Sequence, residues 1–384
     1  MGNTKNFFEK KKEWSILKDQ ILDYYLTPYL PKILSLNKPL LIFDCFAGKG
    51  RFDDGDIGSP IIIAKQIKEY VDKNVSGIFI EKKYADELKE NIKSFSNCSV
   101  IEGEYESNIK TILDSNQDSS IFLYIDPYGI RSLDLDYFKE ISKIQFTSFE
   151  MLMNFNSFGF LREGCRILKF KDLQIDEKLE NFYELEGDED IEKMNIIAGG
   201  DYWIDILSKY NSGENDMFKT EELFVNEYTN KLKQIFKYVV SIPIKLKITN
   251  LPKYRMIFGT NHKDGLILMA GNMNKKWKQI LESDRKGQLV FFDEFSDESI
   301  IGKINLEEGI VDLLKQTGEI ELQQLIVNLI ERYGISFSES EYKKKIKELE
   351  GKIVSISREP STTPTGRKAI ALNYKKYKIN VGLL

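Results

Sequence analysis

The sequence is poor in the residues on which most metal and nucleophile sites depend. It contains one histidine, His262, so a multi-histidine metal site is excluded and a Ser–His–Asp site would have to use that residue. Its three cysteines, Cys45, Cys98 and Cys165, lie far apart without a C-x-x-C pair, which excludes zinc-ribbon and iron–sulfur spacings. An odd number of scattered cysteines is typical of a reducing compartment. We therefore predict no metal site.

Long hydrophobic runs are also missing. No apolar stretch reaches the roughly 18 residues that a membrane-spanning helix requires. Residues 1–13 are polar and carry lysines, without the apolar core of a secretion signal. With 42% hydrophobic and 30% charged residues, the composition is that of a folded chain. Its 384 residues suggest two or three domains, and we expect a cytoplasmic protein with no membrane partner.

The formal net charge of −5 is the sum of two unlike parts. From Tyr342 to Leu384 there are eleven basic and three acidic residues, a net charge of +8, so the rest of the chain carries −13. A basic segment attached to an acidic body suggests contact with a polyanion such as nucleic acid. A solvated, lysine-rich helix face would explain the charge equally well.

Short apolar runs alternate with helical patterns over the first part of the chain. A leading helix or two is expected over 14–36, interrupted near Pro28 and Pro31. The alternation predicts an α/β fold with a doubly wound, Rossmann-like parallel sheet covered on both faces. The expected strands are 39–43, 75–80, 98–101, 121–125 and 148–154, and the expected helices are 59–72, 83–94, 106–115 and 133–144.

The pattern changes after residue 160. An acidic helical stretch is interpreted as an insertion or lid, and strands are expected at 238–248, 255–260 and 265–270, the last two forming a hairpin. The C-terminal pattern is helix, short strand, helix, helix, and two strands at 352–357 and 368–372, which suggests a winged helix. The predicted domains are an N-terminal helical segment 1–38, a sheet domain 39–160 with 235–300, an insertion 161–234 and a basic winged-helix-like domain 305–384.

Carboxylates follow the ends of the first four predicted strands. Asp44 and Glu81 end the first two strands. Glu102 and Glu104 follow the third, and Asp126 follows the fourth. Because the carboxyl ends of parallel strands meet at one edge of a sheet, where ligands bind, we expect these acids to surround one crevice.

This pattern discriminates between ligands. A Walker loop is absent, and the dinucleotide fingerprint fails because position 53 is Asp and the next helix begins only near Ser59. Clustered carboxylates would also repel a pyrophosphate. They suit a neutral nucleoside with a cationic centre, since an acid can bind ribose hydroxyls and negative charge favours a sulfonium. We therefore predict S-adenosylmethionine (SAM) as the cofactor.

The same segments resemble the motifs of class I SAM-dependent methyltransferases. DCFAGKGR resembles the glycine-rich first motif, FIEKK the second, EGEY the third and YIDPYG the fourth. The resemblance implies a doubly wound Rossmann-like methyltransferase sheet with Glu81 in the ribose-binding position. The implied cofactor-binding residues are Asp44, Phe46, Ala47, Gly48, Gly50, Glu81, Lys82, Glu102 and Glu104.

The fourth motif implies the catalytic residues. In DNA amino-methyltransferases it is typically [DNS]PP[YFW], whose polar residue and backbone carbonyl hold the target amino group while the aromatic ring stacks on a flipped base. The implied catalytic residues here are Asp126, Pro127 and Tyr128. The motif DPYG departs from the pattern, because it has one proline and its aromatic residue comes one position early.

Most of the first 270 residues are similar to the three-Cys-motif partner family (TcmP). The similarity covers DCFAGKGR, IGSP, FIEKK, EGEY, YIDPYG, MNFNSFG and IFGTNH with GLILM, in that order. It implies a bacterial, methyltransferase-like protein that accompanies a separate protein with a three-cysteine, radical-SAM-like motif. The absence of that cysteine motif from this chain agrees with the resemblance.

Three functions remain open. The first is methyl transfer from SAM to a nucleic acid or a base within it, and the second is a catalytically weak or inactive SAM-binding module that acts through its partner. The third is a metal-dependent nuclease, since Glu81-Lys82-Lys83 offers E-x-K. The expected nucleic-acid contacts in the basic domain are Lys343, Lys344, Lys347, Arg358, Arg367 and Lys368.

Plainer roles also fit individual residues. Asp44 could cap backbone groups at a strand end, and Glu81 could form a surface ion pair with Lys82. The other plainer roles are packing for Tyr128, a pair with a nearby aspartate for Arg51, turn formation for Asn154 and Asn156, and a hairpin turn for His262.

Overall fold

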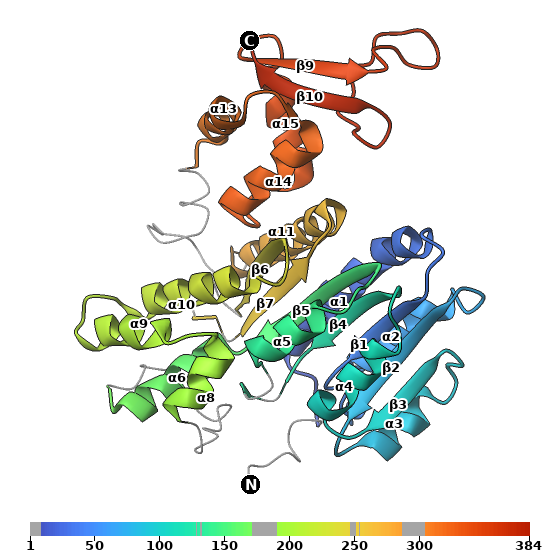
Figure 1. Ribbon diagram of the computed structural model, residues 1–384, viewed down its shortest axis with the longest axis vertical. Coiled ribbons are helices and arrows are strands. Elements are labelled where there is room, and N and C mark those ends of the chain that lie inside the picture. The colour runs from blue at the N-terminus through green and yellow to red at the C-terminus, as the bar shows by residue number, and fades with distance from the viewer. Residues whose placement is uncertain are drawn as a thin grey trace. The chain divides into compact units, whose positions relative to one another are not determined.

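The chain folds into two compact units (Figure 1). The computed structural model describes residues 9–127, 129–130, 133–170, 190–245, 251–252, 254–285 and 304–384. Unit 1 comprises Met1–Leu246 with Asn250–Asn261, and unit 2 comprises Lys247–Thr249 with His262–Leu384. Three predictions lie outside the described residues: Tyr128, most of the acidic stretch and residues 286–300 of the sheet domain. No helix in the described ranges has the length and apolar character needed to cross a membrane.

Unit 1 is built on a seven-stranded sheet of order β3-β2-β1-β4-β5-β7-β6. Its first five strands are parallel, and β7 runs antiparallel to both of its neighbours. The predicted parallel, doubly wound sheet is therefore confirmed, with one reversed strand. The strands are β1 Leu40–Asp44, β2 Val75–Glu81, β3 Cys98–Glu102, β4 Ser120–Ile125, β5 Ser148–Phe155, β6 Tyr238–Ile244 and β7 Tyr254–Thr260.

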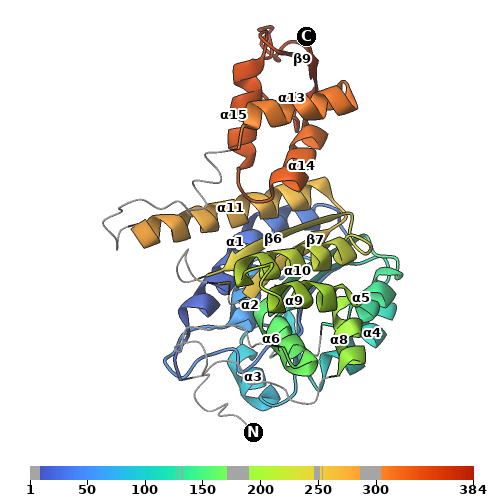
Figure 2. The ribbon, with the colours of Figure 1, turned by 90° about the vertical axis from the view of Figure 1, so that its left-hand side faces the viewer.

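Helices cover both faces of this sheet (Figures 1 and 2). On one face α1 packs through Tyr25, whose ring lies 5.7 Å from that of Phe122 on β4. The opposite face carries the large buried cluster to which α4, α5, α6, α8, α9 and α10 contribute. The helices of unit 1 are α1 Glu13–Leu34, α2 Ser59–Lys68, α3 Ala85–Ile92, α4 Tyr105–Asp114, α5 Leu135–Ser142, α6 Ser157–Leu168, α8 Ile191–Ala198, α9 Tyr202–Asn211 and α10 Met217–Leu232.

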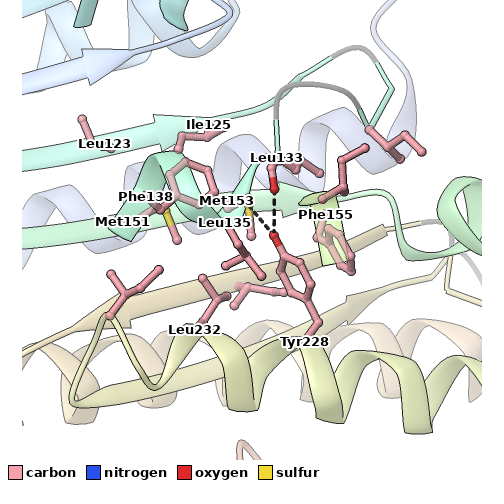
Figure 3. Close-up of a cluster of buried hydrophobic side chains, with 14 of the residues drawn as sticks. Leu123, Ile125, Leu133, Leu135, Phe138, Met151, Met153, Phe155, Tyr228 and Leu232 are labelled. Carbon is pink, nitrogen blue, oxygen red and sulfur yellow. Dashed lines mark hydrogen bonds between the residues drawn. The ribbon is translucent and has the colours of Figure 1, made fainter. Parts of the chain in front are cut away.

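Figure 3 shows how α10 enters the core of the sheet domain. The Tyr228 ring stacks on that of Phe155 at 4.0 Å, and both side chains are fully buried. The Tyr228 hydroxyl donates to the Leu133 carbonyl at 3.5 Å. Burying such a side chain contributes about 2–3 kcal/mol. The described helices of the predicted insertion are therefore part of the core, and the lid interpretation does not fit them.

The N-terminal helix is continuous, contrary to the expected interruption. Pro28 and Pro31 both lie inside α1. Each proline removes one helical hydrogen bond. Buried Tyr25, Tyr29 and Leu30 anchor the helix on the sheet, and this burial offsets the lost bonds.

Unit 2 contains four helices and a three-stranded sheet of order β8-β10-β9 within its described residues. The predicted strand at 265–270 is wrong, because this segment lies in α11. Its apolar residues Leu266, Met269, Met273 and Trp277 recur at helical spacing, which a window of six residues could not distinguish from a strand. The elements are α11 Lys263–Arg285, α13 Leu306–Thr317, β8 Ile320–Glu321, α14 Leu322–Tyr333, α15 Glu339–Leu349, β9 Val354–Glu359 and β10 Lys378–Leu383.

The last strand also differs from the prediction. Residues 368–372 form no strand, and β9 instead pairs antiparallel with β10, from Lys378 opposite Glu359 to Leu383 opposite Val354. In β10 the apolar residues Ile379 and Val381 alternate toward the buried face. That alternation gives β10 a core-facing side, whereas Ile370 in the predicted segment is exposed.

Candidate functional site

The loop after β1 depends on two glycines with left-handed backbone conformations. Gly48 has φ 61° and Gly50 has φ 75°, which other residues adopt only with strain. A Cβ on Gly50 would also lie 2.9 Å from Leu88 Cδ1 on α3. Glycine at these two positions therefore lets the loop close tightly between β1 and α2.

Glu81, at the end of β2, holds this loop in place. Its Oε2 accepts a hydrogen bond from the Gly48 N–H at 2.7 Å. Its Oε1 accepts from the N–H groups of Lys83 and Tyr84, at 2.7 and 3.2 Å. An ionised carboxylate has about four acceptor sites, so one on Oε2 is left for a ligand. These three hydrogen bonds favour a role for Glu81 in holding the glycine loop over a surface ion pair with Lys82.

The two acids at the end of β3, Glu102 and Glu104, are more exposed than Glu81. Glu104 pairs with Lys82 at 2.5 Å, and both side chains are more than half exposed. Glu102 is exposed and lies 3.5 Å from Lys89 on α3. The five acids predicted at the four strand ends thus share one sheet edge, but Asp44, Glu81 and Asp126 are the more enclosed ones.

Asp44, at the end of β1, is fully buried. Its Oδ1 accepts from the Phe46 N–H at 3.2 Å, while its Oδ2 has no hydrogen-bond partner among the described residues. Burial raises the pKa of this carboxyl to about 7, partly opposed by nearby hydrogen-bond donors. A buried carboxylate oxygen without a partner is costly, which favours a cationic or hydrogen-bonding ligand at this point.

Asp126 lies directly after β4 at the same edge and is surrounded by hydrogen-bond donors. Lys18 Nζ lies 2.8 Å from Oδ1 and 2.6 Å from Oδ2. Asn154 Nδ2, on β5, donates to Oδ1 at 2.8 Å, and the Tyr124 hydroxyl lies 3.5 Å from Oδ2. Pro127 follows and is buried. The structure thus brings Asp126 and Asn154 together across the neighbouring strands β4 and β5.

Lys18 is a site residue that the sequence interpretation missed. It lies on α1 with Ser15, Asp19 and Leu22, all of them buried. Spacings of three and four residues put these side chains on one helix face. Two charged residues within an otherwise apolar helical stripe were the available signal, since lysine and aspartate are seldom buried unless paired.

A second ion pair lies one residue farther along α1. Lys11 Nζ lies 2.5 Å from Asp19 Oδ2 and also donates to the Ile57 carbonyl at 2.6 Å. The Lys11 N–H donates to Asp54 Oδ2 at 3.2 Å. Burial raises the pKa of Asp19 to about 6, opposed by Lys11. Lys11 therefore connects α1 to the loop at 51–57, beside the glycine loop.

Other candidates have structural roles. Asn156 caps α6 by accepting the Gly159 N–H at 2.8 Å, so turn chemistry explains it. His262 does not form a hairpin turn; its carbonyl accepts the Leu266 N–H at the start of α11. Asp53 lies 3.5 Å from Lys49, one of the ion pairs of this loop. Among the described residues, no group of three or more histidine, cysteine, aspartate or glutamate side chains is placed to hold a metal ion.

The predicted nucleic-acid contacts in unit 2 divide into two groups. Arg358 is 4% exposed and makes two hydrogen bonds to Glu350, at 2.7 and 3.2 Å, so its guanidinium stabilises the fold instead of facing a ligand. Lys343 pairs with Glu339 and lies 4.3 Å over the Tyr374 ring. The exposed members are Lys344, Lys347, Arg367 and Lys368, of which Lys347 pairs with Glu350.

No protein-family model matches the chain, and no curated protein matches it. Solved structures similar to it include Trm1 from Pyrococcus horikoshii with S-adenosyl-L-methionine, at 8% identity and TM-score 0.34, covering 84% of this chain and 90% of that one. Another is yhhF from Escherichia coli, provisionally described as a methyltransferase, at 14% identity and TM-score 0.22. A third is spermidine synthase from Thermotoga maritima, at 9% identity and TM-score 0.31, covering 75% of this chain and 70% of that one.

The overlap with yhhF spans 33% of this chain and 64% of that protein, less than two thirds of its length. Scores this low carry no argument about function. The strand order and the reversed β7 confirm the coarser prediction for unit 1, an α/β fold with a doubly wound, mostly parallel sheet.

Proposed function

We propose that this protein is a SAM-dependent methyltransferase that acts on nucleic acid. The observation that carries the proposal is the convergence of Asp44, Glu81 and Asp126 at the carboxyl edge of β1, β2 and β4, around a glycine loop. Ligands of open α/β sheets bind at this edge. Three carboxylates there favour a cationic nucleoside over a phosphate-bearing one.

The residues present fit SAM. Asp44 Oδ2 is a buried acceptor without a partner in the described structure, suited to a cationic group. Glu81 retains one acceptor site for a ribose hydroxyl, and the glycine loop lets the backbone approach closely. We propose Lys82, Glu102 and Glu104 as the outer rim of the SAM site, and Phe46 and Ala47 as its near wall. When bound, SAM would supply an electrophilic methyl group.

The chain itself would orient the nucleophile. Asp126 and the Pro127 carbonyl lie beyond β4, next to the β1 end where the cofactor would bind. Tyr128 is proposed as the stacking wall for a base, as the motif resemblance implies. Positioning two reactants in this way supplies much of the rate enhancement of a transfer reaction.

Unit 2 would bind the nucleic acid backbone. The order of its elements after α11, helix, strand, helix, helix, strand, strand, supports the winged-helix proposal, and its exposed Lys344, Lys347, Arg367 and Lys368 suit phosphate contacts. Such contacts bind strongly without reading much sequence. We place the protein in the bacterial cytoplasm, with the three-Cys-motif, radical-SAM-like protein as its partner by resemblance.

A second candidate is a SAM-binding module with weak or no catalysis that works through this partner. The observation in its favour is that Lys18 and Asn154 already occupy Asp126, which would otherwise be open to a substrate amino group. Nuclease chemistry has less support, because Glu81 of the E-x-K segment is bonded to three backbone N–H groups.

Calorimetry with SAM, followed by a tritiated-methyl assay, tests the proposal. DNA, RNA and the partner protein would each be offered as acceptors to wild type and to Asp44→Asn and Glu81→Gln variants. We expect binding that both variants weaken and label transfer to one nucleic acid. Glu90→Gln, an exposed change on α3, is the matched control. Binding without transfer would favour the second candidate, and absence of SAM binding would refute both.

A further inference from the structure

The contact between α1 and the end of β4 is an unusual place for a lysine. The Lys18 side chain is 8% exposed, and that of Asp126 is 24% exposed. Burying an ammonium group is unfavourable unless a partner compensates for its lost hydration. Asp126 supplies this compensation through both of its oxygens. The lysine therefore pairs with the residue that has the strongest claim to touch a substrate.

The acceptor sites of Asp126 are largely used within the chain. Lys18 contacts both oxygens, and Asn154 donates to Oδ1 at 2.8 Å. The Tyr124 hydroxyl approaches Oδ2 at 3.5 Å. A carboxylate has about four acceptor sites, so little capacity remains for a hydrogen bond from a substrate. What Asp126 offers the crevice is a negative charge in a fixed place.

The helix turn that carries Lys18 is itself held firmly. Asp19 pairs with Lys11 at 2.5 Å. About two turns later, the Tyr25 ring stacks on Phe122 of β4 at 5.7 Å. The Lys18 ammonium also lies 5.1 Å from the centre of the Tyr254 ring. These contacts leave Lys18 little freedom to move away from Asp126.

We propose that Lys18 is a positioning residue of the candidate active site, which holds the Asp126 carboxylate in one orientation. This inference rests on the proposed methyltransferase function. When a neutral nucleophile attacked, its lone pair would form the new bond to the methyl carbon while the C–S bond of SAM broke and its electron pair went to sulfur. Positive charge would develop on the nucleophile, where a fixed carboxylate would stabilise it electrostatically, and the proton of the methylated group would then pass to solvent. Helix α1 is thus part of the catalytic site.

A double-mutant cycle in the full chain tests the proposal. The variants are Lys18→Met, Asp126→Asn and the two combined, with Lys32→Met, an exposed change on the same helix, as the control. We expect K18M to lower kcat for methyl transfer by about 100-fold, as misplaced catalytic groups do, while KM for SAM changes little. The double variant should be no slower than D126N alone, because Lys18 acts only through Asp126. Single effects that multiply in the double variant would overturn the proposal.

Folding failure and failure of the proposed function are separated by two further measurements. The combined variant replaces the ion pair with neutral groups, so it should fold even if K18M alone does not. If wild type methylates neither DNA nor RNA, the proposed function falls, and the positioning role is decided by crystal structures. Displacement of the Asp126 carboxylate by more than about 0.5 Å in K18M supports it. An unmoved carboxylate refutes it.

Discussion

The buried Glu150 on β5 provides the sharpest test of how unit 1 is held together. Its side chain accepts hydrogen bonds from the Tyr25 hydroxyl of α1 at 2.6 Å and from Thr260 of β7 at 3.0 Å. Burial raises the pKa of this carboxyl from 4.5 to about 7, partly opposed by those two hydrogen bonds. Replacing it by glutamine removes the ionisation and keeps the shape of the side chain.

The sign of the pH dependence follows from proton binding. Between pH 4.5 and about 7 the unfolded chain releases the Glu150 proton while the folded chain keeps it, so the free energy of unfolding falls as the pH rises. The difference between these two pKa values corresponds to about 3 kcal/mol of unfolding free energy. In Glu150→Gln this contribution is absent. The difference in unfolding free energy, variant minus wild type, should therefore rise by about 3 kcal/mol from pH 4.5 to pH 8.

Urea unfolding at a series of pH values measures this difference. A Trp277→Phe background leaves Trp14 and Trp203, both in unit 1, as the fluorescent reporters. Glu69→Gln, an exposed change after α2, is the control and should give a difference that does not vary with pH. Other buried acids titrate in both proteins and cancel. A pH-independent difference for Glu150→Gln would show that the carboxyl is ionised in the folded state, and the reasoning would fail.

Three further predictions follow from single contacts. Gly50→Ala should lower stability by about 1–2 kcal/mol and weaken SAM binding, because φ is 75° and the new Cβ would meet Leu88. An unchanged melting temperature and an unchanged SAM affinity in calorimetry would contradict this. Arg358→Met should destabilise unit 2 by about 3 kcal/mol in thermal unfolding, because it leaves Glu350 without its bidentate partner, and a normal melting curve would argue against that role. Changing Lys344, Arg367 and Lys368 together to alanine should leave the melting curve intact but lower the slope of log affinity for RNA or DNA against log salt by about 2–3. An unchanged slope would show that these residues form a solvated surface that makes no contact with nucleic acid.

Much of the sheet could be predicted because its strands are nearly continuous apolar runs. The first five expected strands each match an observed strand within one or two residues. Such runs arise where both faces of a parallel strand are covered. The prediction failed where a short segment permits two structures: residues 265–270 are helical and 368–372 are irregular. In both cases residues outside the short segment determined its structure. Residues 265–270 belong to the long helix α11, and the strand that pairs with β9 is β10, whose apolar residues alternate more clearly.

The candidate site was predicted unevenly for a related reason. Asp44 and Glu81 follow their strands directly, so the strand pattern itself put them at one edge. Glu102 and Glu104 have the same position in the sequence pattern, yet they are exposed and pair with lysines. Which acid turns inward depends on the packing around it.

The sequence by itself determined the order of the elements, the parallel sheet and the edge where the carboxylates collect, because these follow from local periodicity and from the geometry of parallel strands. Only the tertiary structure decided which charges meet. Lys18 and Asp126 are 108 residues apart, and their contact depends on how α1 lies across the sheet. Glu150 likewise meets Tyr25 from 125 residues away. Buried charges need specific partners, and the local periodicity of the sequence does not identify partners that are distant along the chain.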